Sequence, residues 1–391
     1  MLNRRLLRIK AMQHIYAYQQ CQQANRALAF DYVRAAFEPD LNAMELPDPE
    51  QLAQDRRMAE EILTARLEGN LGPTKSSETA QRVAKEALER YDTQTQKDRA
   101  FLKNQMLARV ESMSDHYKLS LLLLVAVADE SHREIQKKPR SAESVLPEKA
   151  VSTRFYLNPV VQAIRDNQAL QQEAANRNWS WEEQQGAIRQ LYRNTIKEDE
   201  AFLTYQHATD TTLEEDVTVV RQVFNEHLLK SEVVNNFFED LDISWEENQK
   251  VIRSLVNRSL KSIVEHPAEG IEIATLTPNW EDDKAFFEKL YSLTVRNDAE
   301  YEQIIAEKSK NWAIDRIASM DQVILKMAIA EMINFSSIPV KVTINEYVDV
   351  SKQYSTQKSK QFINGLLDVI AQSLQERSLI RKSGRGLIDN R

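Results

Sequence analysis

The residues best suited to binding a ligand lie near the two ends of the chain. Four basic residues with no acid among them open the sequence: Arg4, Arg5, Arg8 and Lys10. At 100° per residue on a helix, the three arginines fall within one arc of about 100°. Arginine and the free N–H groups of a helix start both bind phosphate, so we expect exposed arginines anchored at the rim of a core. A merely solvated basic helix end is the alternative.

A second basic cluster precedes the carboxy terminus. Three lysines lie around a predicted turn between two helices: Lys352, Lys358 and Lys360. Thr343 and Glu346 fit a capping box, so we expect the first of these helices to begin there. Gly365 lies inside the second helix, where glycine costs ~1 kcal/mol relative to alanine. We therefore expect another helix to approach closely at Gly365.

Residue patterns typical of enzymes are missing from the sequence. None of the six histidines belongs to an H-E-x-x-H or E-x-x-H motif, and no G-x-S-x-G elbow occurs. The seven glycines cannot be assembled into a dinucleotide or triphosphate loop. Cys21 is the only cysteine, which excludes an intrachain disulfide and a cysteine zinc cluster. We expect a protein that is not an enzyme, with no catalytic residue, metal ion or cofactor.

Composition indicates an all-α protein of two or three domains. The chain has 391 residues, of which 42% are hydrophobic, but only 7 are glycine and 10 are proline, which disfavours turn-rich sheet folds. The longest apolar run, 119–128, is shorter than the ~20 residues that span a bilayer, so we expect a buried helix and no membrane association. A single cysteine fits the reducing cytoplasm. The net charge of -8 disfavours indiscriminate nucleic-acid binding but permits a local basic site.

Hydrophobic periodicity predicts helices along most of the chain. Their expected ranges are 4–34, 49–67, 79–136, 148–174, 180–208, 214–240, 245–264, 280–307, 312–334, 344–354 and 356–380. Stretches with glycine or proline separate several of them, most clearly at 68–73, 137–148 and 266–278. A weak echo also relates residues 67 positions apart, such as Asp216 with Asp283. Two similar helical hairpins or chance would explain this echo.

The carboxy-terminal motif resembles that of a known family. Residues 338–368, from Ile338-Pro339-Val340 to Asn364-Gly365-Leu366-Leu367-Asp368, are similar to the signature of NusB, the bacterial transcription antitermination factor. Residues 321–332, 283–305 and 3–18 resemble other helices of that family. The resemblance covers the first ~20 and the last ~110 residues. About 250 residues of additional helical sequence separate these two parts.

The resemblance implies a NusB-like two-subdomain helical bundle assembled from the two chain ends, plus a large additional helical region. Residues 1–34 would be its arginine-rich helix and 271–380 its carboxy-terminal bundle. Residues 35–270 would be a helical insertion of unknown role, and 381–391 a basic flexible tail. The insertion would extend the core, form a separate bundle or mediate dimerisation.

The family's function implies binding of boxA-type single-stranded RNA together with ribosomal protein NusE. Their complex would promote read-through by RNA polymerase on ribosomal RNA operons. The positions assigned to RNA are Arg4, Arg5, Arg8 and Lys10, with Lys358 and Phe362 on a second patch. At position 6 this sequence has leucine where the family usually has a third consecutive arginine. The alternative interpretation of Phe362 is an aromatic side chain of the core. Tyr16 and Asp321 match positions that face NusE, although a place in the core is the favoured interpretation of Tyr16.

Two other functions compete with RNA binding. A similar domain opens some RNA cytosine methyltransferases, but those enzymes need a glycine-rich cofactor loop and catalytic cysteines, which this sequence lacks. The other is a non-catalytic protein–protein adaptor that has lost RNA binding. An adaptor has no need of the arginine arc. The RNA-binding interpretation requires residues 1–20 to pack against residues 280–375.

Overall fold

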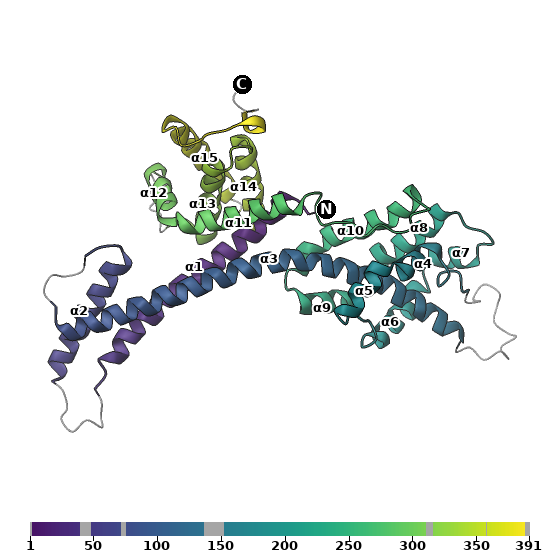
Figure 1. Cartoon of the computed structure of the whole chain (residues 1–391), viewed down its shortest axis with the longest axis horizontal. Coiled ribbons are helices and arrows are strands. Elements are labelled where there is room, and N and C mark those ends of the chain that lie inside the picture. Colours follow the sequence, from purple (N-terminus) through teal and green to yellow (C-terminus); the bar gives the residue numbers. More distant parts are fainter. Residues whose placement is uncertain are drawn as a thin grey trace. The chain divides into compact units, whose positions relative to one another are not determined.

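A computed structural model describes residues 2–39, 48–71, 76–136, 152–309, 316–356 and 358–387. Within these ranges every regular element is a helix and no strand occurs, which confirms the predicted all-α class (Figure 1). None of the described helices combines the length and the apolar character that crossing a bilayer requires.

The chain divides into two compact units, which are described separately. Unit 1 contains Ala108–Trp280 and the first residues of the chain, and unit 2 contains Arg4–Leu107 and Glu281–Arg391. The elements of unit 2 are α1 (Arg4–Ala36), α2 (Pro49–Leu67), the first part of α3 (Glu78–Gln136), α11 (Trp280–Arg296), α12 (Asp298–Lys308), α13 (Ser319–Asn334), α14 (Val340–Tyr354), α15 (Ser359–Glu376) and a 3₁₀ turn, η5 (Gly384–Leu387). Unit 1 holds the rest of α3 with α4 (Pro159–Asp166), α5 (Gln168–Asn176), α6 (Gln185–Leu191), η2 (Tyr192–Ile196), α7 (Glu200–His207), α8 (Leu213–Gln222), η3 (Val223–Leu228), α9 (Glu232–Leu241) and α10 (Trp245–Glu265).

The core of unit 2 is built around α13. Every residue from Val323 to Met332 is buried, so this helix is covered on all sides. The neighbours of α13 are α1, α12, α14 and α15. These neighbouring helices bury one face each, as with Ile363, Leu367 and Ile370 on α15. A fully buried central helix thus collects the apolar faces of amphipathic ones.

The second half of α1 belongs to another part of unit 2, where it packs with α2 and the start of α3. Small and branched side chains form this core, including Ala29, Val33, Ala59 and Leu63. The bounds of α2 match the predicted 49–67 because its ends carry local signals. Asp48 accepts a hydrogen bond from the Glu50 N–H at 3.0 Å, with proline at the first helical position.

Unit 1 surrounds the second half of α3. The predicted buried helix at 119–128 is confirmed, since Leu121, Leu123 and Leu124 have no exposed area. Acidic residues farther along α3 form ion pairs with α6 and η2. Arg189 contacts Glu130 at 2.9 Å, and Arg193 contacts Glu134 at 2.6 Å.

Some predicted helices are divided or displaced because polar side chains cap the backbone. Within the described part of the range 148–174, helix begins only after Asn158 and is divided at Asn167. The side chains of these two asparagines accept hydrogen bonds from the N–H groups of Val160 and Leu170. The capping box expected at Thr343 is wrong. The helix α14 begins at Val340, after Pro339, and Thr343 is already inside it.

The echo of 67 residues is reflected in only part of the helix boundaries. The helix α8 begins at Leu213 and α11 at Trp280, while α9 begins at Glu232 and α12 at Asp298. The third pair of helices does not keep the offset, since α10 begins at Trp245 and α13 at Ser319, which is 74 residues later. The echoed carboxylates have different partners. Asp216 accepts a hydrogen bond from Tyr205 at 2.6 Å, whereas Asp283 accepts one from Arg4.

The compact units divide the sequence differently from the ranges expected for the NusB-like parts. Residues expected as one insertion, 35–270, are shared between the units, with α2 and the start of α3 in unit 2. Residues 381–387, expected in a flexible tail, include η5 and pack against the turn between α13 and α14. Residues 388–391 lie outside the described residues.

Candidate nucleic-acid interface

The two ends of the chain meet in unit 2. The amino-terminal part of α1 lies against α13 and α14 (Figure 1). Three arginines of α1 form ion pairs with the carboxy-terminal region: Arg4, Arg5 and Arg8. The packing that the RNA-binding interpretation requires is therefore present.

Arg8 is buried instead of exposed, so the sequence-based expectation for its exposure is wrong. Only 3% of Arg8 is accessible, and its guanidinium donates two hydrogen bonds of 2.8 Å to the carboxylate of Glu331 on α13. Tyr347 and Thr343 donate hydroxyl hydrogen bonds to the same carboxylate at 3.1 and 2.9 Å. Arg8 therefore joins α1 to α13 and α14 and does not contribute to the exposed basic surface.

The pKa values of Arg8 and Tyr347 are both raised in this cluster. Burial lowers the pKa of Arg8, but the hydrogen bonds and the negative charge of Glu331 outweigh it, and the net pKa is raised. The pKa of Tyr347 is raised well above its ordinary value, chiefly by burial and then by the charge of Glu331. The Arg8 guanidinium therefore remains charged and the Tyr347 phenol remains neutral at neutral pH.

Arg4 and Arg5 lie at the surface, and each has a carboxylate partner. Arg4 Nε donates to Asp283 Oδ1 at 3.0 Å, and its guanidinium lies 4.9 Å from the centre of the Phe286 ring. Arg5 donates two hydrogen bonds to Glu346, at 3.0 and 2.9 Å. The side chains of Arg4 and Arg5 keep 42% and 45% of their area exposed, so solvent-facing N–H groups remain for a ligand.

Asp349 connects the basic residues of both chain ends. Its carboxylate lies 2.9 Å from Arg5 and also accepts a hydrogen bond from Lys352. Its pKa is lowered, first by the hydrogen bond from Lys352 and also by the charges of Arg5 and Lys360. Asp349 therefore brings Arg5 close to Lys352 and within reach of the charge of Lys360. We call the exposed basic residues of the two chain ends the basic strip: Arg4, Arg5, Lys352, Lys358 and Lys360.

The second predicted RNA patch lies on α15, next to this strip. Lys358 is exposed at the start of α15, and Phe362 is half-buried one turn later. Gly365 and Val369 continue the same helical face, at spacings of three and four residues. A Cβ atom at Gly365 would meet nothing within 4 Å, so the close helix contact expected there is wrong.

The remaining predicted site residues differ in how accessible they are to solvent. Lys10 has no exposed area, and Tyr16 is half-buried on α1. Asp321, expected on a partner-facing surface, is only 4% exposed. Its Oδ2 atom accepts a hydrogen bond of 2.7 Å from Ser359, at the start of α15. Through this hydrogen bond, the buried Asp321 stabilises the turn on which Lys358 lies.

Sequence reasoning missed the carboxylates that hold the arginines. Asp283, Glu331, Glu346 and Asp349 lie on three different helices, far from α1 in the chain. One signal was available, because Glu346 and Asp349 are three residues apart on one helical face, matching the spacing of Arg5 and Arg8. That spacing acquires meaning only once α1 is known to lie beside α14.

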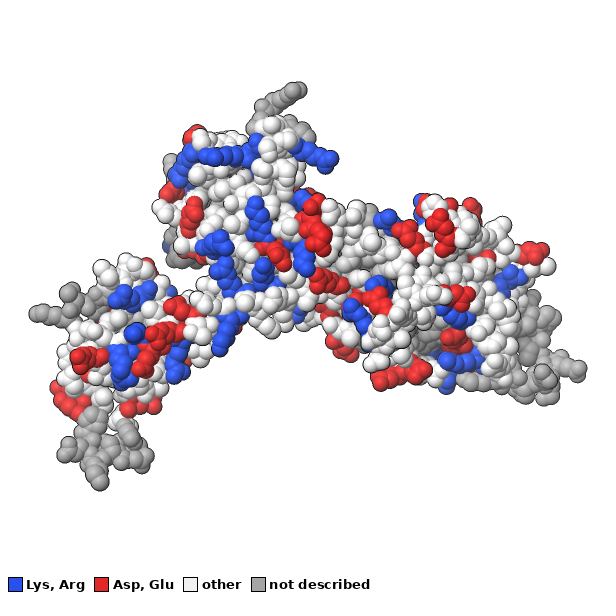
Figure 2. Space-filling view, viewed as in Figure 1, with Lys and Arg blue, Asp and Glu red and all other residues white. Residues whose placement is uncertain are grey.

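The surface elsewhere is of mixed charge. Figure 2 shows basic and acidic side chains interspersed over much of the face that it draws. Among the described residues, no group of three or more histidine, cysteine, aspartate or glutamate side chains is arranged to hold a metal ion.

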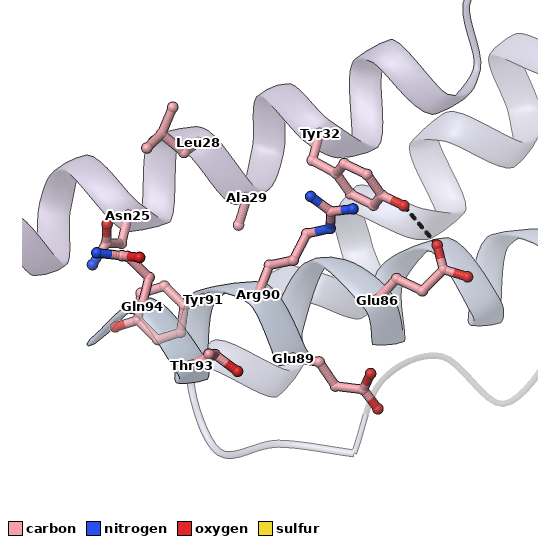
Figure 3. A pocket seen from close by; sticks show the side chains of 10 residues that line it. All are labelled: Asn25, Leu28, Ala29, Tyr32, Glu86, Glu89, Arg90, Tyr91, Thr93 and Gln94. Carbon is pink, nitrogen blue, oxygen red and sulfur yellow. Dashed lines mark hydrogen bonds between the residues drawn. The ribbon is translucent and has the colours of Figure 1, made fainter. Parts of the chain in front are cut away.

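A separate hollow of about 710 Å³ lies between α1 and α3 in unit 2 (Figure 3). Tyr32 donates a hydrogen bond of 2.6 Å to Glu86, and the Arg90 guanidinium lies 4.2 Å from the centre of the Tyr32 ring. The hydrogen bond to Glu86 and burial raise the pKa of Tyr32. Glu86 and Glu89 offset the charge of Arg90 here, so this hollow does not resemble a phosphate site.

Comparison with known proteins locates a family domain in the carboxy-terminal third of the chain. Residues 253–372 match the model of the NusB family. The chain is 38% identical over 106 residues to the transcription antitermination protein NusB of Chloroherpeton thalassium, covering 27% of this chain and 50% of that protein. It is 39% identical over 103 residues to the protein of the same name from Salinibacter ruber, covering 26% and 64%. For Natranaerobius thermophilus the identity is 40% over 91 residues, covering 23% and 66%.

The chain thus spans between half and just under two thirds of the length of these relatives. No solved structure matches it significantly. The matched range holds α11 to α14, most of α15 and the end of α10, while α1 and the basic residues that it carries lie outside it. Residues 253–372 therefore form a NusB-family domain within a much longer helical chain.

Proposed function

We propose that this protein is a transcription antitermination factor that binds boxA-type single-stranded RNA together with ribosomal protein NusE. In this role it promotes read-through by RNA polymerase on ribosomal RNA operons. The observation that carries the proposal is the meeting of Arg5 and Lys352 at Asp349, which unites cations from both chain ends. The relatives' name, transcription antitermination protein NusB, supports the same conclusion.

The proposed RNA surface is the basic strip, extended by Phe362. Arg4 and Arg5 are already held by ion pairs with carboxylates, so less side-chain entropy is lost when phosphate binds. The half-buried ring of Phe362 offers a base-stacking platform beside Lys358. About three to five neutralised phosphates would give a log–log salt slope of roughly -2 to -4.

Fluorescence anisotropy with a labelled boxA RNA, with and without NusE, tests the proposal. The variant Arg4→Gln/Arg5→Gln should weaken binding and reduce the salt slope by about 1.4, since two phosphate contacts of ~0.7 each are lost. The matched control is Arg56→Gln/Arg57→Gln, which removes the same charge from exposed positions of α2. Equal affinities for both variants and the unmodified protein would contradict the assignment.

The adaptor function is the second candidate, and one observation favours it. Arg4, Arg5 and Arg8 each form an ion pair with a carboxylate of the same unit. The arginine arc therefore has a structural role that does not depend on RNA. An adaptor would show no RNA binding at low salt in the anisotropy experiment, with or without NusE. It would still bind NusE in a separate titration that uses labelled NusE.

A further inference from the structure

The carboxy-terminal segment 377–387 is packed against the turn between α13 and α14. The Ser383 N–H donates to the Ser336 carbonyl at 3.0 Å, and Lys382 Nζ donates to the Phe335 carbonyl at 2.9 Å. Gly386 lies so close to the α13–α14 turn that a Cβ atom at this position would be 2.1 Å from the backbone carbonyl oxygen of Ser336. Several specific contacts, not charge alone, therefore place this segment.

The docked segment 377–387 brings Lys382 into the region around Arg4. Lys382 and Lys289 donate to consecutive carbonyls, those of Phe335 and Asn334, at 2.9 and 3.0 Å. The ring of Phe335 packs on Phe286 with centroids 5.1 Å apart, and the guanidinium of Arg4 lies over Phe286. A pair of phenylalanine rings thus joins Arg4, Lys289 and Lys382 into one cluster.

The packed segment also directs two arginines to solvent. Arg381 and Arg385 are exposed, and the hydroxyl-bearing residues Ser336 and Ser337 of the turn are exposed beside them. Figure 2 shows basic side chains along the edge of unit 2 where Figure 1 places this segment. Arginine forks and serine hydroxyls are the groups that proteins use to contact phosphate oxygens.

We propose that the segment 377–387 extends the RNA-binding surface, so that a strand bound at Arg4 continues over the α13–α14 turn. Arg381 and Arg385 contact its backbone phosphates there, and the docked segment holds them in place. This inference rests on the proposed RNA-binding function. The ligand is the sugar–phosphate backbone outside the boxA core, because the cluster presents cations and hydroxyls and buries its two aromatic rings.

The test compares three RNAs: a boxA RNA, the same RNA extended at its 5′ end, and the same RNA extended at its 3′ end. Each extension has about eight nucleotides, a length within the site sizes of proteins that bind single strands. One of the two extensions should strengthen binding to the full chain about tenfold at physiological salt, as two further phosphate contacts would. Arg381→Gln/Arg385→Gln should abolish that gain and leave the affinity for core RNA unchanged. Arg56→Gln/Arg57→Gln should retain the gain.

A second variant separates position from charge. Gly386→Ala keeps both arginines but removes the space in which the segment docks, so it should also lose the gain. If neither extension strengthens binding, or if the gain survives Arg381→Gln/Arg385→Gln, the inference is overturned while the proposed function stands. If the unmodified protein binds neither core nor extended RNA, the proposed function fails, and the inference with it.

Discussion

Arg8 and Glu331 form a two-point ion pair whose members are 323 residues apart in the chain and inaccessible to solvent. The pair is completed by hydroxyl donors from Tyr347 and Thr343, so each carboxylate oxygen has two hydrogen-bond donors. A buried charge that loses its partner is strongly destabilising. The amino-terminal helix is therefore held in place by electrostatics as well as by apolar packing.

Substitution of Arg8 should lower the stability of unit 2. Arg8→Met leaves Glu331 buried without its cation, and we expect a loss of about 3–5 kcal/mol. Arg5→Met, which breaks an exposed pair, should cost about 1 kcal/mol or less. Urea unfolding followed by circular dichroism measures both. A loss for Arg8→Met no greater than that for Arg5→Met would show that the pair does not hold α1.

Neutralising Asp349 should strengthen RNA binding. In Asp349→Asn the negative charge between Arg5 and Lys352 is gone, so incoming phosphate meets less repulsion and less competition for both cations. We expect a gain of about two- to fivefold, the size of an exposed ion-pair effect. Anisotropy titrations at low and high salt measure it. Glu61→Gln, on the exposed side of α2, is the control and should leave the affinity unchanged.

Alanine at Gly365 should stabilise the protein. The position is in the middle of α15, and a Cβ atom there would meet open space. Helix propensity then predicts a gain of about 1 kcal/mol. A shift of the urea midpoint to higher concentration, with an unchanged slope, would confirm it. Gly386→Ala is the contrasting case, because its Cβ would collide with Ser336, and amide hydrogen exchange at Ser383 should become faster.

Lys382 should lose its proton near physiological pH. Burial lowers its pKa to about 8, although the charge of Glu331 acts in the opposite direction. The folded state therefore binds this proton less tightly than the unfolded chain, whose lysine pKa is ~10.4. Packing of the segment 377–387 should become more stable as pH rises from about 8 towards ~10.4. NMR of ¹³C-methylated lysines would detect the transition, and it should vanish in Lys382→Arg.

Local signals explain which parts of the fold were predictable. The bounds of α2 followed from Asp48 and Pro49 at its start and from glycine just beyond its end, because capping acts between residues close in sequence. Capping by Asn158 and Asn167 also explains why the continuous helical periodicity over 148–174 predicted one helix where the structure has two shorter ones. The close helix contact predicted at Gly365 is absent, because a glycine in a helix does not reveal whether the space beside it is filled.

The amino-acid sequence by itself determined the all-α class, the bounds of α1, α2, α3 and α10 to within two residues, the family resemblance of the carboxy-terminal region and the basic character of both chain ends. These properties depend on composition and on spacings of a few residues. Only the tertiary structure decided which cations face solvent. Arg5 and Arg8 share a helical arc, but one lies at the surface and the other is buried against Glu331. Burial and ion pairing depend on which distant helix is packed alongside, and that is set by the fold as a whole.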